Sequence, residues 1–152
     1  MPSRNVKLCR IHSSGDFFNQ TYFDAWILAA YRLPHITFYA YTKALPYWIK
    51  RKEYLPFNMR LVASRGGVYD ALIEKHNLRN VKVVFSDAEA ITANLPLDHN
   101  DTHAWEHTGN FAILIHGTQP AGTVAGKVMY ALRRAGKNGY KSGYFDHYSK
   151  AK

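Results

Sequence analysis

Cysteine is almost absent from this 152-residue chain, which holds only Cys9. One thiol cannot form an internal disulfide, and it cannot supply an all-cysteine zinc or iron–sulfur site. A chain of this length buries about two-thirds of its unfolded surface, so its core needs neither a metal nor a disulfide in order to form. We therefore expect a single α/β domain over residues 1–136. We expect no iron–sulfur cluster, and the identity of any other cofactor stays unknown.

Long hydrophobic runs are also missing, and none approaches the ~18 apolar residues that a membrane-spanning helix requires. No signal-peptide pattern opens the sequence. Apolar residues make up 47% and charged residues 20% of the chain, which is typical of a globular protein and excludes bulk disorder. We expect a cytoplasmic protein with no membrane partner.

Lys and Arg are missing from residues 83–126, although the whole chain carries a formal charge of +9. That segment has a net charge of −5, whereas residues 1–82 carry +8 and residues 127–152 carry +6. A uniformly basic surface would indicate simple binding to phosphate backbones. The acidic, histidine-rich interruption favours a localised site instead.

Hydrophobic periodicity predicts strands that alternate with helices. Short apolar or β-branched runs bounded by turn residues predict five strands, at 7–11, 36–41, 59–63, 81–85 and 111–115. Helical spacing predicts helices after the caps Asn19 and Thr123, a short helix with Pro46 in its first turn and a helix over 68–75, while residues 88–109 are expected to mix loop with a short helical turn. This alternation predicts a mainly parallel five-stranded sheet with flanking helices. The sheet is either open or a partial (β/α) barrel, because a closed barrel needs eight units.

Polar side chains follow every predicted strand, and ligands of parallel α/β proteins bind at this end of the strands. Polar turns explain one such ending, but five together favour a functional cleft. The candidate catalytic residues are His12, Asp16, Asp87 and His116, with His12 or His116 as proton donor or acceptor. The candidate ligand-binding residues are Ser14, Thr42, Lys43, Arg65, Ser86 and Thr118.

Two of these assignments have simpler alternatives. Asp16 is either the partner of His12 in acid–base chemistry or a residue that accepts backbone amides in the turn at Gly15. Lys43 and Arg65 either clamp the phosphate or carboxylate of a ligand or are solvated surface cations.

Three histidines, His99, His103 and His107, are spaced four residues apart. On a continuous helix their imidazoles would share one face, which would suit zinc or a similar metal. The pattern matches no known metalloprotease motif, and Asn100 and Asp101 favour turns. A polar, partly exposed loop is the alternative to a metal site.

The C-terminal tail, 137–152, interleaves lysines with Tyr140, Tyr144, Phe145 and Tyr148. Such a mixture binds single-stranded nucleic acid by charge and stacking, or it packs on a neighbouring subunit. An open sheet leaves edge strands with unpaired backbone groups, and a second copy of the chain can cover them. The open sheet therefore favours a homo-oligomer.

The stretches 10–18, 24–26 and 36–43 (Arg-Ile-His-Ser-Ser-Gly-Asp-Phe-Phe, Asp-Ala-Trp and Ile-Thr-Phe-Tyr-Ala-Tyr-Thr-Lys) resemble the phage "gene product eighty-eight" domain family. The resemblance covers roughly residues 7–90. It implies phage origin, hence the cytoplasm of a host cell, and a partial barrel similar to divergent radical-SAM proteins. Longer family members carry cysteine clusters, whereas this chain holds only Cys9. Radical-SAM chemistry needs three cysteine thiolates, so an iron–sulfur radical enzyme is not supported. The resemblance implies no known reaction, because no activity is established for the family.

The favoured function is binding of a small anionic, nucleotide-like ligand at the carboxyl ends of the strands. Whether the chain is an enzyme is left open. The alternatives are a nucleic-acid-binding protein that uses the basic face and tail, and a host-directed inhibitor or other interaction protein whose site has lost its chemistry.

Overall fold

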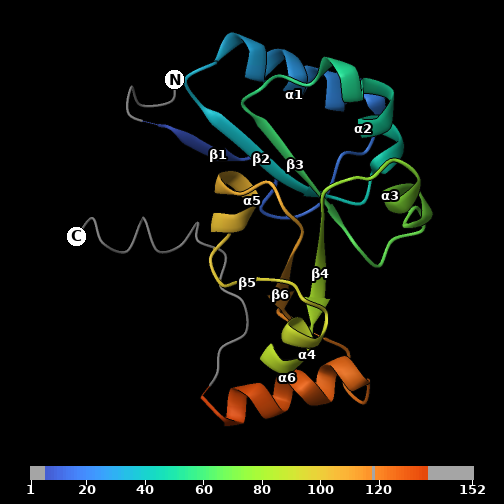
Figure 1. Cartoon of the computed structure of the whole chain (residues 1–152), viewed down its shortest axis with the longest axis vertical. Helices are drawn as coiled ribbons and strands as arrows, with labels where there is room; N and C mark the ends of the chain where they lie inside the picture. The colour runs from blue at the N-terminus through green and yellow to red at the C-terminus, as the bar shows by residue number, and fades with distance from the viewer. Residues whose placement is uncertain (1–5, 118, 137–152) are drawn as a thin grey trace. The chain divides into compact units, whose positions relative to one another are not determined.

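The structure, a computed structural model, describes residues 6–117 and 119–136 (Figure 1). Within this part of the chain two compact units are formed. Unit 1 comprises residues 6–80 and 104–108, and unit 2 comprises residues 81–103, 109–117 and 119–136. The predicted tail, 137–152, lies outside the described residues.

Unit 1 contains a parallel sheet in the order β1-β2-β3, formed by β1 (Leu8–Arg10), β2 (Thr37–Thr42) and β3 (Met59–Ser64). Its helices are α1 (Gln20–Arg32), α2 (Leu45–Arg51), the short 3-10 helix η1 (Lys52–Tyr54) and α3 (Ala71–Lys75). Because the three strands run in one direction, their carboxyl ends meet at one edge of the sheet.

Helices α1 and α2 lie on the same side of this sheet (Figure 1). Asn19 begins α1 by accepting the Tyr22 amide on its side chain, and a proline stands in the first turn of α2. The buried face of α1 carries Phe23, Ile27 and Ala30, at the spacing that the sequence predicted. These residues join Trp48 of α2 and the inward-facing residues of β2 and β3 in one hydrophobic core.

Unit 2 contains a second set of parallel pairings in the order β4-β6-β5, formed by β4 (Asn80–Val84), β6 (Phe111–Leu114) and β5 (Leu97–Asp98). Its helices are α4 (Asp87–Thr92) and α6 (Val124–Arg134). A further short helix, α5 (Thr102–Glu106), lies where the chain passes from unit 2 into unit 1. All four residues of β6 are buried, as expected for a strand covered on both faces.

The predicted α/β class with a mainly parallel, helix-flanked sheet is confirmed, but six strands are found in the described residues instead of five. The additional strand, β5, has only two residues, which is too short to show an alternating pattern. Helix α3 begins at Ala71, later than the predicted start at Val68. Among the described residues no helix is long and apolar enough to cross a membrane.

Candidate functional site

Asp16 joins the loop after β1 to the end of β2. Its Oδ1 atom accepts the Thr42 hydroxyl at 2.6 Å and the Phe17 amide at 2.7 Å, and its Oδ2 atom accepts the Lys43 amide at 2.7 Å. Thr42 is buried, and its hydroxyl oxygen also accepts the amide of Ala44. Both carboxylate oxygens of Asp16 are therefore engaged. This arrangement supports the turn-forming alternative for Asp16, while an acid–base role stays a prediction.

His12 follows β1 and packs against aromatic rings. Its Nε2 atom lies 3.3 Å from the hydroxyl of Tyr22, and its ring makes a T-shaped contact with Phe17 at 4.7 Å between centroids. Its Nδ1 atom is buried and has no hydrogen-bond partner in the described part of the chain. Burial holds the pKa of His12 below its ordinary value of 6.5, against the opposing effect of the Asp16 charge. His12 is therefore a neutral imidazole at pH 7, a form that can accept a proton.

The loop after β3 holds a carboxylate in a small backbone cradle. Asp70 Oδ2 accepts the amide of Gly66 at 2.8 Å, and Asp70 Oδ1 accepts the amide of Gly67 at 2.9 Å. Gly66 has a φ of +92°, the left-handed conformation that glycine adopts without strain. Two successive amides pointing at one anion form a concave anion-binding nest.

Two cations stand around this cradle. The Gly66 amide makes the largest contribution to lowering the pKa of Asp70, and the Gly67 amide and the charges of Arg65 and Lys43 act in the same direction. Lys43 is exposed, and its ammonium donates to the Gly66 carbonyl at 3.3 Å. The Lys43–Gly66 contact joins the end of β2 to the loop after β3, while the role of Lys43 and Arg65 in clamping a ligand stays a prediction.

Arg65 is more restrained than Lys43. Its Nη2 atom lies 2.6 Å from Glu74 Oε1, and its Nε atom donates to Asn80 Oδ1 at 2.7 Å. These two bonds fix the guanidinium plane of Arg65. Ser14, the remaining candidate in unit 1, is exposed in the turn at Gly15, where φ is +79°.

Unit 2 holds the other strand-end candidates. Ser86 begins α4, since its hydroxyl accepts the amide of Glu89, and Asp87 is exposed in the first turn of that helix. His116 follows β6, and its Nδ1 atom lies 3.2 Å from the Leu114 carbonyl oxygen. Strands β4 and β6 are paired in parallel, so these residues follow strands that end side by side. Thr118 lies outside the described residues, and convergence of this group with the one in unit 1 stays a prediction.

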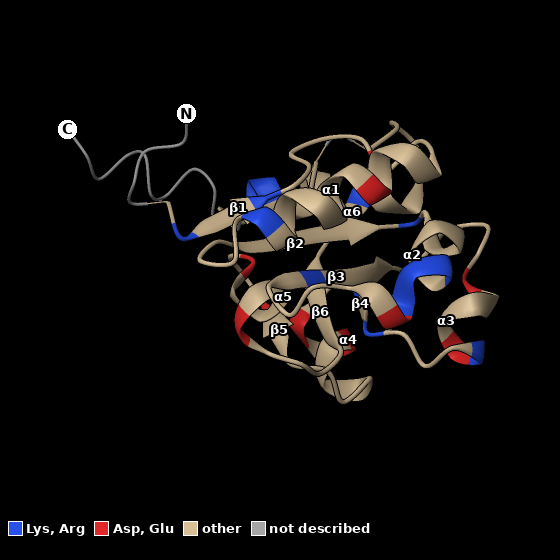
Figure 2. Cartoon of the chain, turned by 90° about the horizontal axis from the view of Figure 1, so that it is seen from above, with Lys and Arg blue, Asp and Glu red and all other residues tan. Residues whose placement is uncertain are grey.

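The histidine-rich segment forms a capped turn. Buried Asp98 accepts the backbone amides of Asn100 and His103, and α5 covers only residues 102–106. His99 and His107 lie outside that helix, so the continuous helical face that a three-histidine metal site required is not formed. Among the described residues no group of three His, Cys, Asp or Glu side chains could hold a metal ion. Figure 2 shows acidic residues on both α4 and α5.

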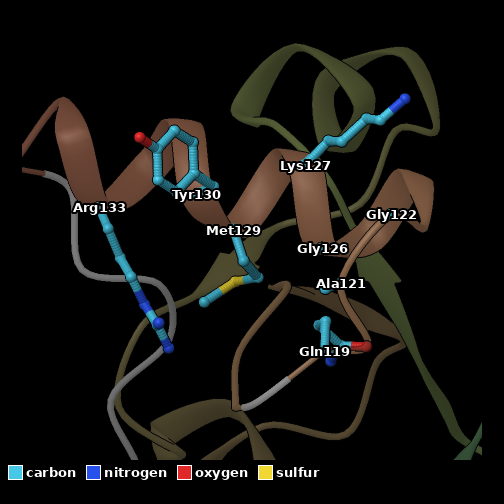
Figure 3. A pocket seen from close by; sticks show the side chains of 8 residues that line it. All are labelled: Gln119, Ala121, Gly122, Gly126, Lys127, Met129, Tyr130 and Arg133. Carbon is cyan, nitrogen blue, oxygen red and sulfur yellow. The ribbon is translucent and has the colours of Figure 1, made fainter.

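A groove of about 390 Å³ lies in unit 2 between α6 and the loop before it. Figure 3 shows Met129 and Gly126 of α6 with Gln119, Ala121 and Gly122 of the loop, and Lys127, Tyr130 and Arg133 along the helix. Gly126 permits close contact with the loop, since a Cβ there would stand 2.3 Å from the carbonyl oxygen of Pro120. The side chains that line this groove include two cations and no carboxylate.

Sequence reasoning missed three features of the site region: the role of Asp70, the exposed ring of Phe18 and the helix α4. Asp70 follows the glycine pair at a spacing that permits a backward bond to their amides, a signal that a turn search could have found. Helix α4 carries the Ser-x-x-Glu pattern of a helix start, at Ser86 and Glu89. No sequence pattern indicated that the Phe18 ring is exposed, because its exposure depends on how the loop packs.

The model of the Gene product 88 family matches residues 2–139 of this chain. No curated protein and no solved structure matches it.

Proposed function

The chain belongs to the Gene product 88 family, and we propose that it binds a small anionic ligand at the carboxyl ends of β1–β3. The observation that supports this proposal is the Asp70 carboxylate, which two glycine amides hold beside Lys43 and Arg65. The same amides and cations suit a phosphate or carboxylate group of a ligand.

Asp70 does not cap its own helix, since no side-chain bond joins it to the first turn of α3. Its carboxylate reaches back to Gly66 and Gly67 instead. It thus acts as an internal anion that a ligand replaces or displaces. Lys43 and Arg65 then clamp the ligand, and neutral His12, which follows β1, accepts a proton if a reaction follows.

Calorimetric titration of the full chain with inorganic pyrophosphate tests this proposal. Lys43→Met should weaken binding about tenfold, since a charge-assisted hydrogen bond is lost. Asp70→Asn should tighten binding, because the competing negative charge is removed. Lys75→Met, which removes another exposed lysine, at the end of α3, should leave binding unchanged. Equal losses in Lys43→Met and Lys75→Met would contradict a defined site.

Nucleic-acid binding is a second candidate, and α6 favours it. Lys127, Arg133 and Arg134 are exposed on this helix, and Tyr130 is 64% exposed with the Arg134 guanidinium 5.8 Å from its ring centroid. The sequence holds no Asp or Glu between Glu106 and Asp146. Cations beside an exposed ring suit the phosphates and bases of a single strand.

Anisotropy titrations of a labelled oligothymidylate at several salt concentrations test this candidate. Arg133→Gln should weaken binding and reduce the slope of log affinity against log salt by about 0.7, the value for one lost phosphate contact. Arg60→Gln removes an exposed arginine on β3 and serves as the control. If both variants behave alike, the binding reflects overall charge and α6 has no special role.

A further inference from the structure

Phe18 is an apolar ring that the fold leaves in solvent, in the loop after β1. It is 70% exposed, although the adjacent Phe17 is buried. One face of the Phe18 ring is stacked on Tyr22, with centroids 4.5 Å apart and planes inclined by 21°. A stacked ring that is still largely exposed can receive a second flat group.

Contacts on both sides hold this ring in place. Phe17 anchors the preceding residue, since its ring packs edge-on against Phe23 at 4.7 Å. Asn19 follows and accepts the Tyr22 amide at 2.7 Å, which fixes the residue on which Phe18 stacks. The hydroxyl of Tyr47, from α2, donates a hydrogen bond to the Phe18 carbonyl oxygen at 3.4 Å. A ring held in this way loses little freedom when a ligand stacks on it.

The loop that carries Phe18 is linked to the cradle through Lys43. Asp16, two residues before Phe18, accepts the backbone amide of Lys43, and the Lys43 ammonium donates to the carbonyl of Gly66. Phe18, Lys43 and Arg65 follow β1, β2 and β3 respectively, and these parallel strands end at one edge of the sheet in unit 1.

We propose that Phe18 is the base-stacking platform of the anion site, and that the ligand is a nucleotide whose phosphates occupy the cradle at Gly66 and Gly67. This inference rests on the proposed function, because it assigns the second half of the same ligand. A planar ring joined to phosphates is the chemistry that an aromatic platform and a cationic nest select together. Stacking alone tolerates any base, with purines favoured by their larger ring area.

Calorimetric titrations of the full chain with a purine nucleoside diphosphate and with inorganic pyrophosphate separate the two halves of the site. Phe18→Ala should weaken nucleotide binding about tenfold and leave pyrophosphate binding unchanged. Phe18→Tyr keeps a ring and should retain nucleotide affinity. Phe57→Ala, which removes another exposed phenylalanine of unit 1, should change neither affinity.

The outcomes distinguish the two proposals. If the wild type binds neither compound, the anion site itself is refuted and the platform with it. If the wild type binds both and Phe18→Ala changes neither affinity, the platform is refuted and the anion site stands. If Phe18→Ala weakens both to the same extent, Phe18 supports the loop and does not stack on a base, which also overturns the inference.

Discussion

A single buried nitrogen gives His12 an unusual electrostatic setting. Its Nδ1 atom is buried without a partner in the described part of the chain, and desolvation lowers its pKa. Since the unfolded chain takes up a proton at this residue more readily than the folded one, protonation favours unfolding. The stabilisation that the folded state gains from a neutral His12 is complete above about pH 6.5. It is lost as the pH falls toward the lower pKa of His12 in the folded state.

We therefore expect His12→Phe to flatten the dependence of Tm on pH between pH 7.5 and 5. At pH 7.5 the variant should stay within about 1 kcal/mol of the wild type, because one hydrogen bond to Tyr22 is lost. Thermal unfolding followed by circular dichroism across this range measures the effect. His35→Gln alters an exposed histidine and is the control. A wild-type profile that His12→Phe leaves unchanged would show that His12 is not desolvated.

Asn58 is a second residue whose side chain determines local structure. It is 3% exposed, and its Nδ2 atom donates to the carbonyls of Ala30, Leu33 and Ile36 at 2.8–3.1 Å. The carbonyls of Ala30 and Leu33 also accept the backbone amides of Leu33 and Ile36, so Asn58 gives each of them a second donor and gives the Ile36 carbonyl its side-chain donor.

Asn58→Ala should lower the free energy of unfolding by about 1–3 kcal/mol, because three hydrogen bonds of a buried amide to backbone carbonyls are lost. Asn58→Asp should cost more, since it removes the donor and places a carboxylate next to carbonyl oxygens. Urea denaturation of both variants at pH 7 measures the difference. Wild-type stability in either variant would mean that water replaces the amide at no cost.

At the scale of an element, Gly126 of α6 stabilises the packing of the helix, although glycine has a low helix propensity. Alanine is more favourable than glycine inside a helix by about 1 kcal/mol, so propensity alone predicts that Gly126→Ala stabilises the protein. The structure predicts the reverse, because a Cβ at this position would stand 2.3 Å from the Pro120 carbonyl oxygen. That atom belongs to the backbone and cannot move without shifting the loop.

We expect Gly126→Ala to lower stability by about 1–3 kcal/mol, the typical cost of overpacking. Gly109→Ala is the matched control, since nothing lies within 4 Å of a Cβ there. Guanidinium denaturation of the two variants decides between the predictions. A gain in stability at position 126 would show that the loop of residues 119–122 can move away from α6.

At the scale of the whole molecule, neither unit is a continuous stretch of chain. Residues 104–108 belong to unit 1, although the residues before and after them belong to unit 2. Arg79 binds this returning segment by donating from Nη1 to the carbonyl of Ala104 at 2.9 Å. Cutting the chain at residue 80 would therefore remove part of unit 1.

We expect the full chain to unfold in one cooperative transition, with equal calorimetric and van't Hoff enthalpies. The fragment 1–80 should fail to give the dispersed amide spectrum of a folded domain, since it lacks 104–108. Differential scanning calorimetry of the full chain and NMR of the fragment provide these measurements. Two separate transitions, or a folded fragment, would show that the units are independent domains.

The order of strands and helices could be predicted from the sequence because local patterns carry it. Strand runs such as 59–63 and the cap at Asn19 depend on side-chain type and spacing, and both agree with the structure within a residue. The sequence also predicts that polar residues at the ends of β1, β2 and β3 meet, since parallel strands end at one edge, and their joint role as a site stays a prediction. The contacts and exposure of each of these residues were decided only by the tertiary structure. Whether Asp16 is free or bonded to the end of β2, and whether Phe18 faces solvent, depend on atoms distant in sequence. Hydrogen bonding between strands, desolvation and exposure are properties of that packed environment, and no local pattern encodes them.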